Sequence, residues 1–260
     1  MDKANLWAMA WHRTTRLLFS LRGLLALMFT VYMMGAIVFF LDEFMASGTV
    51  IGELVALFNA RPDLQFQWAF FDSGMSKLVT LFVAPLFIFD SISGDKSGER
   101  TGLILARPIS RVQYLMINLV SAILAFGIVY FGVLSPGYWA ISPSVPELEM
   151  GAYFSTMVLM FLLGIVAMSG VMLISAFAKS NLVSFIASFG VMSVFMLPNA
   201  MKYSSQAYMD VARATPHYYA TYFTTNDITG GDYVLHAVIV LLFAVPFLAL
   251  TIMKFGKEDL

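Results

Sequence analysis

The amino-acid sequence predicts an all-α integral membrane protein, with six transmembrane helices preceded by an amphipathic interfacial elbow helix and with both termini cytoplasmic. The first observation is composition, because 60% of the 260 residues are hydrophobic and only 12% are charged. Soluble domains are about 45–50% apolar and about 25% charged. The second observation is a series of long charge-free runs. A chain this apolar cannot cover a water-facing surface, which excludes a soluble enzyme and a disordered chain.

The positions of the spans follow from length, since a transmembrane helix needs about 20 mostly apolar residues. One run, 78–89, is too short and reaches a full span only when it is extended to 74–92, with Lys77 and Asp90 snorkelling toward opposite interfaces. Another run is too long, and we expect Pro136 to end its helix. Within a transmembrane domain over 23–260, the predicted spans are 23–41, 74–92, 112–136, 150–178, 180–201 and 233–253.

The segment 1–22 has the pattern of an amphipathic helix. At 100° per residue, Trp7, Trp11 and Leu18 share one face. Polar residues lie on the opposite face: Asn5, His12, Arg16 and Ser20. We expect this elbow helix to lie along the inner leaflet, with its tryptophans among the lipid headgroups.

The basic residues orient the spans. Eleven of the 15 Lys and Arg residues lie in 1–22, 90–111, 179 and 254–260. Loops rich in Lys and Arg stay on the cytoplasmic side, so these segments are predicted to face the cytoplasm. The segment 203–232 is then an outer loop, and its many tyrosines suggest that it returns to the outer membrane interface.

The side chains suggest little chemistry. The net charge of −1 gives no basic surface for nucleic acid, and the chain has no cysteine to act as a nucleophile or thiolate ligand. Lys96 follows Asp95 where a phosphate-binding loop needs glycine. An intramembrane serine hydrolase built on Ser169 and His236 stays open as an alternative, as does a membrane anchor or scaffold that recruits a cytoplasmic protein. We expect no catalytic, cofactor or metal site in this chain.

The loop 93–111 carries a resemblance to a known family. Ile92–Ser93–Gly94–Asp95, followed by Leu103–Ile104–Leu105–Ala106–Arg107–Pro108–Ile109–Ser110–Arg111, resembles the inner loop of type-two ATP-binding-cassette (ABC) exporter permeases. The ending Phe255–Gly256–Lys257–Glu258–Asp259–Leu260 is similar to the Phe-x-x-x-Asp-Leu terminus of many members. Asp95 stands where glutamate is usual, and Glu99 lies close by, so either could be the family's coupling acid.

The resemblance implies a transport subunit and no enzyme. Such permeases act as dimers with a second copy or a homologous permease in a prokaryotic inner membrane. ATP and Mg are held by a separate cytoplasmic ATPase subunit, which docks on the elbow helix and on 93–111. The residues implied in coupling are Asp95, Glu99, Arg100, Pro108 and Arg111. The transported substrate is not identified by these motifs.

The fifth predicted span offers small residues for close helix approach. Ser184 and Ser188 lie four residues apart, with Gly190 nearby. Small side chains let helices approach closely in a membrane. The resemblance puts this span near the dimer centre, so these residues are a candidate pathway or dimer face, with packing inside one subunit as the alternative.

Because the native chain has no cysteine, its orientation can be tested by labelling single cysteines without background. We expect cysteines at positions 97 and 257 to be inaccessible to an impermeant thiol reagent in whole cells. Cysteines at positions 59 and 226 should be labelled. Labelling at position 97 would contradict the orientation and the cytoplasmic location of the loop.

Overall fold

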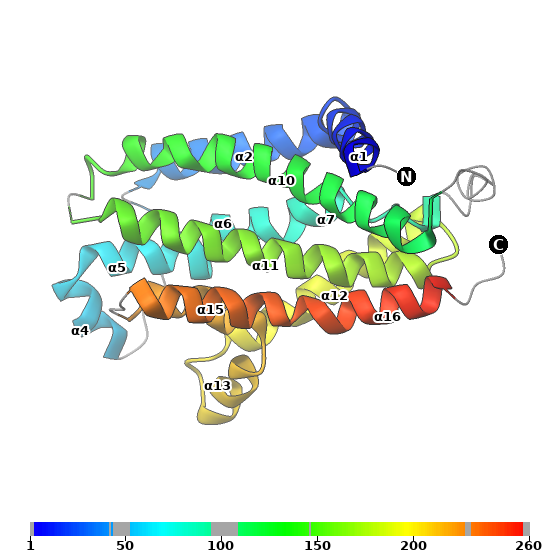
Figure 1. Ribbon diagram of the computed structural model, residues 1–260. Helices are drawn as coiled ribbons and strands as arrows, with labels where there is room; N and C mark the ends of the chain where they lie inside the picture. The colour runs from blue at the N-terminus through cyan, green and yellow to red at the C-terminus, as the bar shows by residue number, and fades with distance from the viewer. Residues whose placement is uncertain are drawn as a thin grey trace.

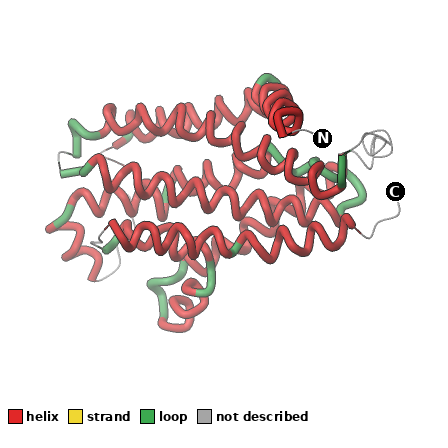
Figure 2. The backbone as a smooth tube through the Cα atoms, in the orientation of Figure 1, coloured by secondary structure: helices red, strands yellow, loops and turns green. Residues whose placement is uncertain are grey.

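The computed structural model describes residues 3–41, 43, 53–94, 109–145, 147–226 and 230–256. Among these residues the secondary structure is helical, with turns and no strand. The long helices lie roughly side by side in a bundle, and short loops connect most of them (Figures 1 and 2). The fold is therefore all-α, as the sequence predicts.

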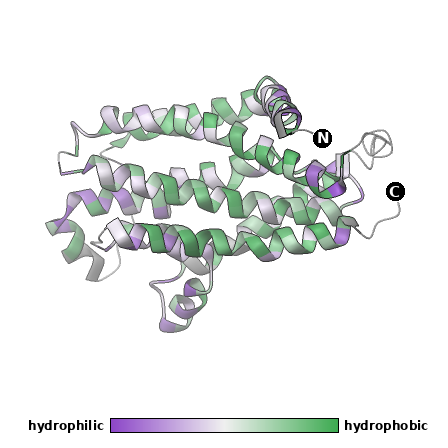
Figure 3. Ribbon diagram, in the orientation of Figure 1, coloured by the Kyte–Doolittle hydropathy of each residue, from purple (hydrophilic) through white to green (hydrophobic). Residues whose placement is uncertain are grey.

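Five helices are long and apolar enough to cross a membrane by length and composition. They are α2 (Leu21–Phe39), the segment Pro62–Leu86, α10 (Arg111–Ile141), α11 (Met150–Phe177) and the segment Gly230–Phe255. In α12 (Asn181–Ala200) the apolar stretch is shorter, Asn181–Ser193. Hydrophobic residues cover the middle of the bundle, and hydrophilic ones gather near its ends and on α13 (Gln206–Arg213) (Figure 3).

Burial separates central helices from outer ones. In the segment Pro62–Leu86, 75% of the apolar window is buried, and in α11 the buried share is 67%. The share falls to 33% in α2 and to 17% in Gly230–Phe255. The outer helices therefore leave large apolar side chains exposed, such as Phe39 and Val234. Exposed apolar surface on long helices is what a lipid-facing helix requires.

The elbow helix α1 (Lys3–Leu18) forms as predicted and packs across α10 near one end of the bundle (Figure 1). The Ser121 hydroxyl donates to the Ala10 carbonyl oxygen at 3.0 Å. The aromatic face is exposed, with Trp7 at 58% and Trp11 at 49%. Gly23, at the start of α2, is required here because a Cβ atom would lie 2.2 Å from the Leu18 carbonyl oxygen.

The second span differs from the prediction. The apolar helix covers Pro62–Leu86 and not 74–92. Its parts are α5 (Pro62–Gln67), the π-helix η1 (Trp68–Ser73), α6 (Met75–Leu78), the π-helix η2 (Val79–Val83) and α7 (Ala84–Leu86). Lys77 therefore lies inside the helix, 5% exposed, and does not snorkel to an interface. Pro62 at the N1 position starts the helix, because a proline there loses no intrahelical hydrogen bond.

Two prolines behave differently from each other. The prediction that Pro136 ends the third span was wrong, because α10 continues through it to Ile141. Pro136 leaves the Gly132 carbonyl oxygen without its intrahelical donor, and membrane helices tolerate such a proline where neighbouring groups satisfy the freed backbone. The last helix is interrupted at Phe243, between α15 (Gly230–Leu242) and α16 (Ala244–Gly256). Pro246 lacks the N–H that would bond back to residue 242.

Residues 203–226 of the predicted outer loop contain α13, α14 (Pro216–Thr221) and the 3-10 turn η3 (Tyr222–Thr224). In Figure 1, α13 projects to the side of the bundle, while α14 packs against α11 and α15. The ring of Phe223 stacks on Tyr233 with centroids 3.9 Å apart. The aromatic residues of this segment thus help to attach it to the last helix.

The contact between α10 and α11 supplies a stability test. A Cβ atom on Gly164 would lie 2.6 Å from Cε1 of Phe126, a fully buried ring. We expect Gly164→Ala to lower the free energy of unfolding by about 1–3 kcal/mol, the usual cost of overpacking. Thermal unfolding in detergent measures the change. Gly132→Ala, where a Cβ atom would meet open space, is the matched control and should be neutral or stabilising. Equal behaviour of the two variants would contradict this packing.

Candidate functional site

The two described ends of the loop 93–111 are the first candidate site. Asp95, Glu99, Arg100 and Pro108 lie outside the described residues. Ser93 and Gly94 precede the gap, and Ile109 and Ser110 follow it. In Figure 1 these ends lie near α1 and near the end of α16.

The end of the loop is fixed by a helix cap. Ser110 and Gln113 form a capping box, in which the Gln113 N–H donates to Ser110 Oγ at 3.2 Å and the Ser110 N–H donates to Gln113 Oε1 at 2.9 Å. Arg111, the first residue of α10, donates to the Phe255 carbonyl oxygen at 3.1 Å. Both Ser110 and Arg111 of the family-like motif therefore have structural contacts, and Arg111 joins the loop to the end of the last helix.

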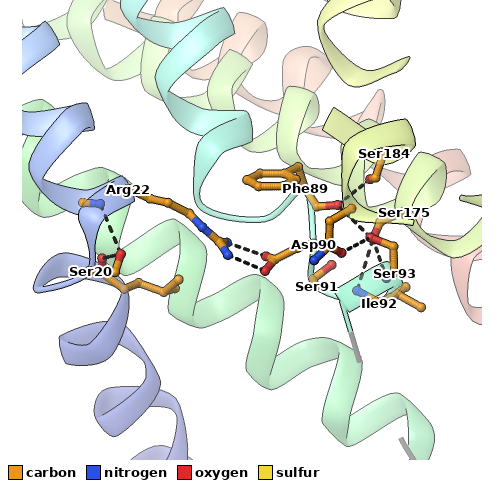
Figure 4. Close-up of polar contacts among 12 residues, drawn as sticks. Ser20, Arg22, Phe89, Asp90, Ser91, Ile92, Ser93, Ser175 and Ser184 are labelled. Carbon is orange, nitrogen blue, oxygen red and sulfur yellow. Dashed lines mark hydrogen bonds and ion pairs between the residues drawn. The ribbon is translucent and has the colours of Figure 1, made fainter. Parts of the chain in front are cut away.

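The segment that precedes the loop is joined to the start of α2, just after the elbow helix. Arg22, in the first turn of α2, makes two 2.6 Å hydrogen bonds to the two carboxylate oxygens of Asp90 (Figure 4). Its guanidinium also lies 4.7 Å from the ring centroid of Phe89. This bidentate pair is strong for its class, because planar geometry and charge act together. It connects residues 68 positions apart, and the sequence alone does not reveal the pairing.

Serine hydroxyls hold the same segment from the other side (Figure 4). Ser175 Oγ, on α11, accepts hydrogen bonds from the N–H groups of Ile92 and Ser93 at 3.1 and 3.0 Å. The Ser91 carbonyl oxygen accepts from the Tyr114 hydroxyl and from the Asn118 amide. Backbone groups just before the loop are thus satisfied by buried side chains of α10 and α11, which fixes where the loop leaves the bundle.

The three residues of the candidate dimer face on α12 differ in burial. Ser184 and Ser188 are fully buried inside the subunit. Ser184 donates to the Phe89 carbonyl oxygen, and Ser188 donates to the Ser184 carbonyl oxygen at 2.6 Å. Gly190 is exposed, with open space where a Cβ would lie. Ser184 therefore contacts residue 89 of the same chain, Ser188 bonds within α12, and other residues form the exposed face of α12, among them Leu182 and Ile186.

A second polar cluster, which the sequence did not predict, lies inside the bundle. Asp72 belongs to η1, and Lys77 lies between the two π-helices. The Lys77 ammonium donates to the Asp72 carbonyl oxygen at 2.7 Å. π-Helical segments are rare and occur frequently at functional sites. Both side chains are at most 5% exposed.

Two further residues complete this cluster: Lys202, which directly precedes the segment 203–232, and His217, which lies inside it. Lys202, just after α12, pairs with Asp72 at 2.6 Å. The Nε2 atom of His217, on α14, lies 3.7 Å from the other carboxylate oxygen of Asp72, too far for a hydrogen bond. We refer to Asp72, Lys77, Lys202 and His217 as the buried charge cluster.

The charge states within the cluster follow from burial and from neighbours. Burial lowers the pKa of the Lys202 ammonium. Asp72 and Tyr203 together raise it by more than burial lowers it, so the pKa lies above its ordinary value. Lys202 is therefore charged. Burial, together with the charges of Lys77 and Lys202, lowers the pKa of His217 well below 6.5. His217 is therefore neutral at physiological pH.

A signal for this cluster exists in the sequence. Asp72 and Lys77 lie five residues apart next to an apolar run, and Pro62 is a helix-start signal upstream. Extending the span backward to Pro62 would have placed both charges inside a helix, where charged residues call for partners. Nothing in the sequence indicates that Lys202 and His217 are the partners.

The residues of the hydrolase alternative have separate backbone partners. Ser169 donates to the Ile165 carbonyl oxygen at 2.9 Å, one turn back in α11. Nδ1 of His236 lies 2.9 Å from the Tyr219 carbonyl oxygen. Within the described part of the chain, no hydrogen bond joins Ser169 to His236. These contacts do not favour a serine nucleophile activated by this histidine.

Comparison with known proteins yields no family: no protein-family model matches the chain, and no curated protein matches it.

The Asp72–Lys202 pair supplies a stability test. Lys202→Met leaves a buried carboxylate without its cation, which costs about 3–5 kcal/mol in measured cases. We expect this variant to melt well below the native protein in detergent, and the double variant Asp72→Asn/Lys202→Met to recover most of the loss. Arg213→Met removes an exposed pair with Asp210 and should leave the melting temperature nearly unchanged. A double variant no more stable than Lys202→Met would show that the pair is not the source of the effect.

Proposed function

We propose that this chain is the transmembrane permease subunit of an ABC exporter, working as a dimer and driven by a separate cytoplasmic ATPase. The helical architecture and its apolar helices suit a multi-pass membrane protein. The loop motif and the C-terminal motif supply the family hypothesis. In this proposal a sixth span corresponds to α12, and the basic residues near both termini face the cytoplasm of a prokaryotic cell.

One observation supports the proposal most directly: an ion pair links the start of α2, just after the elbow helix, to the segment just before the loop. Arg22 follows the elbow helix by one turn, and Asp90 precedes the loop 93–111. A soluble ATPase that pushes on either element would therefore act on both. The ends of the loop, α1 and the end of α16 also lie near one another in the bundle (Figure 1). A docking surface for a cytoplasmic subunit needs such a cluster of elements at one end.

Charge reversal in the loop tests the docking surface. Exposed ion pairs contribute about 0–1 kcal/mol each, whereas like charges forced together cost several kcal/mol. We therefore expect Glu99→Lys to abolish co-purification of the ATPase while the permease still inserts and folds. A matched reversal on the ATPase should partly restore transport. Glu53→Lys, in α4 (Glu53–Ala60) at the other end of the bundle, is the control and should have no effect.

The variant Asp90→Asn tests whether binding of the ATPase can be distinguished from the coupling of ATP hydrolysis to transport. We expect this variant to bind the ATPase normally but to lose most ligand-stimulated ATP hydrolysis and transport, because the elbow and the loop are no longer tied. If Glu99→Lys and Asp95→Lys both leave ATPase association unchanged, the loop is not a docking surface. The anchoring or scaffold function would then be favoured over transport.

A further inference from the structure

The rotation of the elbow helix α1 about its own axis is fixed by its contacts with α10. Ala10 and Thr14 are buried on this side of the helix. The Ser121 hydroxyl donates to the Ala10 carbonyl oxygen at 3.0 Å, and the Thr14 hydroxyl donates to the Ser121 carbonyl oxygen at 3.4 Å. With α1 held in this way, the large rings of Trp7 and Trp11 remain exposed and are not covered by the protein.

The polar face of α1 is basic. The helix contains three basic residues, Lys3, Arg13 and Arg16, and no acidic residue. Arg16 is exposed, and no other residue in the described part of the chain forms an ion pair with it. At 100° per residue, Arg16 lies nearly opposite Trp7 and Trp11. Because an arginine in a protein is always charged, α1 has a permanent cation on one side and exposed aromatic rings on the other.

This arrangement matches the layers of a membrane surface. Tryptophan rings concentrate at the level of the lipid headgroups, and basic residues on the polar face of an interfacial helix attract anionic lipids. A guanidinium can form two parallel hydrogen bonds to one phosphate group. Asn5 and His12 are exposed on the same polar face as Arg16, so their side chains can add hydrogen bonds to headgroup oxygens.

We propose that α1 is a binding surface for anionic phospholipid. The lipid lies alongside the helix, with its phosphate group at Arg16 and its acyl chains at the level of Trp7 and Trp11. In Figure 1, α1 crosses one end of the bundle, and the described helices that it mainly contacts are α10 and α2. The proposal goes beyond the transport function, because lipid binding needs neither the ATPase nor a transported substrate.

Tryptophan fluorescence tests the proposal on the full chain in bilayers of phosphatidylcholine and phosphatidylglycerol. The chain has four tryptophans, so the elbow signal is the difference between the native chain and the variant Trp7→Phe/Trp11→Phe. Bromine atoms on the acyl chains of one lipid at a time quench the tryptophans that this lipid contacts. We expect phosphatidylglycerol to bind at the elbow about fivefold more strongly than phosphatidylcholine, roughly the effect of one basic residue at an anionic surface. Equal quenching by the two brominated lipids would overturn the proposal.

Variants of Arg16 locate the phosphate. Arg16→Gln should make the binding of the two lipids nearly equal, and Arg16→Lys should keep most of the preference because it keeps the charge. Arg213→Gln makes the same change on the exposed helix α13, so it is the matched control and should leave the preference unchanged. Because Arg16 is exposed, its variants should fold like the native chain, which thermal unfolding checks. A native preference in folded Arg16→Gln would overturn the proposal.

Two further measurements identify what binds to Arg16. Glycerol phosphate has the phosphate group without acyl chains and should not displace brominated phosphatidylglycerol. Displacement would indicate a site for free anions and overturn the assignment of a lipid. The proposed ATPase is the other candidate, and we expect it to co-purify normally with Arg16→Gln. Loss of the ATPase from this variant, with the lipid preference unchanged, would assign the basic face to the ATPase instead.

Discussion

Charged residues inside an apolar helix need partners, and in this protein the partners determine where neighbouring segments lie. The segment Pro62–Leu86 is three-quarters buried, yet it carries Asp72 and Lys77 in its interior. An unpaired charge in such a place costs several kcal/mol, and water cannot supply the partner. The partners therefore come from the chain itself, as the Lys202 side chain and the backbone carbonyl of Asp72. Because Lys202 follows α12, satisfying Asp72 also fixes where α12 ends and where the segment leading to α14 begins.

The same helix is attached to its neighbours by further polar contacts. Ser76 Oγ lies 3.2 Å from the Tyr130 hydroxyl of α10, and the Thr156 hydroxyl of α11 donates to Gln67 Oε1 at 3.2 Å. Hydrophobic force does not distinguish lipid from protein in a membrane, so polar contacts and close packing select helix partners there. This explains why the least apolar of the five long helices lies at the centre. Hydropathy alone does not decide the position of the other helices, because α11 and the last helix have the same mean hydropathy of 2.6 but are 67% and 17% buried.

Fold class and most helix positions could be predicted from the sequence, because composition and charge-free runs report directly on helices in lipid. The segments 23–41 and 150–178 nearly coincide with α2 and α11. The second span begins earlier than predicted, because charged residues usually mark the ends of a span and here Asp72 and Lys77 lie inside the helix. Pro136 does not end α10, which continues to Ile141.

The candidate sites were less predictable than the fold. Asp90 and Lys77 are conspicuous in the sequence, but long-range pairing determines what each does. Asp90 meets Arg22 across 68 residues. Lys77 is buried between η1 and η2 and donates to the Asp72 carbonyl oxygen, and no periodicity in the sequence indicates a π-helix. Ser110 and Gln113 form a capping box whose role is local, so the structure adds a contact that their spacing alone can indicate.

The Arg22–Asp90 pair and the buried charge cluster both hold the helix Pro62–Leu86 and the turn that follows it. The Arg22–Asp90 pair holds the segment that follows α7, and the buried charge cluster holds the earlier turns of the same helix. Between them lies the π-helix η2, a rare kind of turn that is frequent at functional sites. The helix is therefore held by ion pairs on both sides of η2, so a change at either pair acts on the same element.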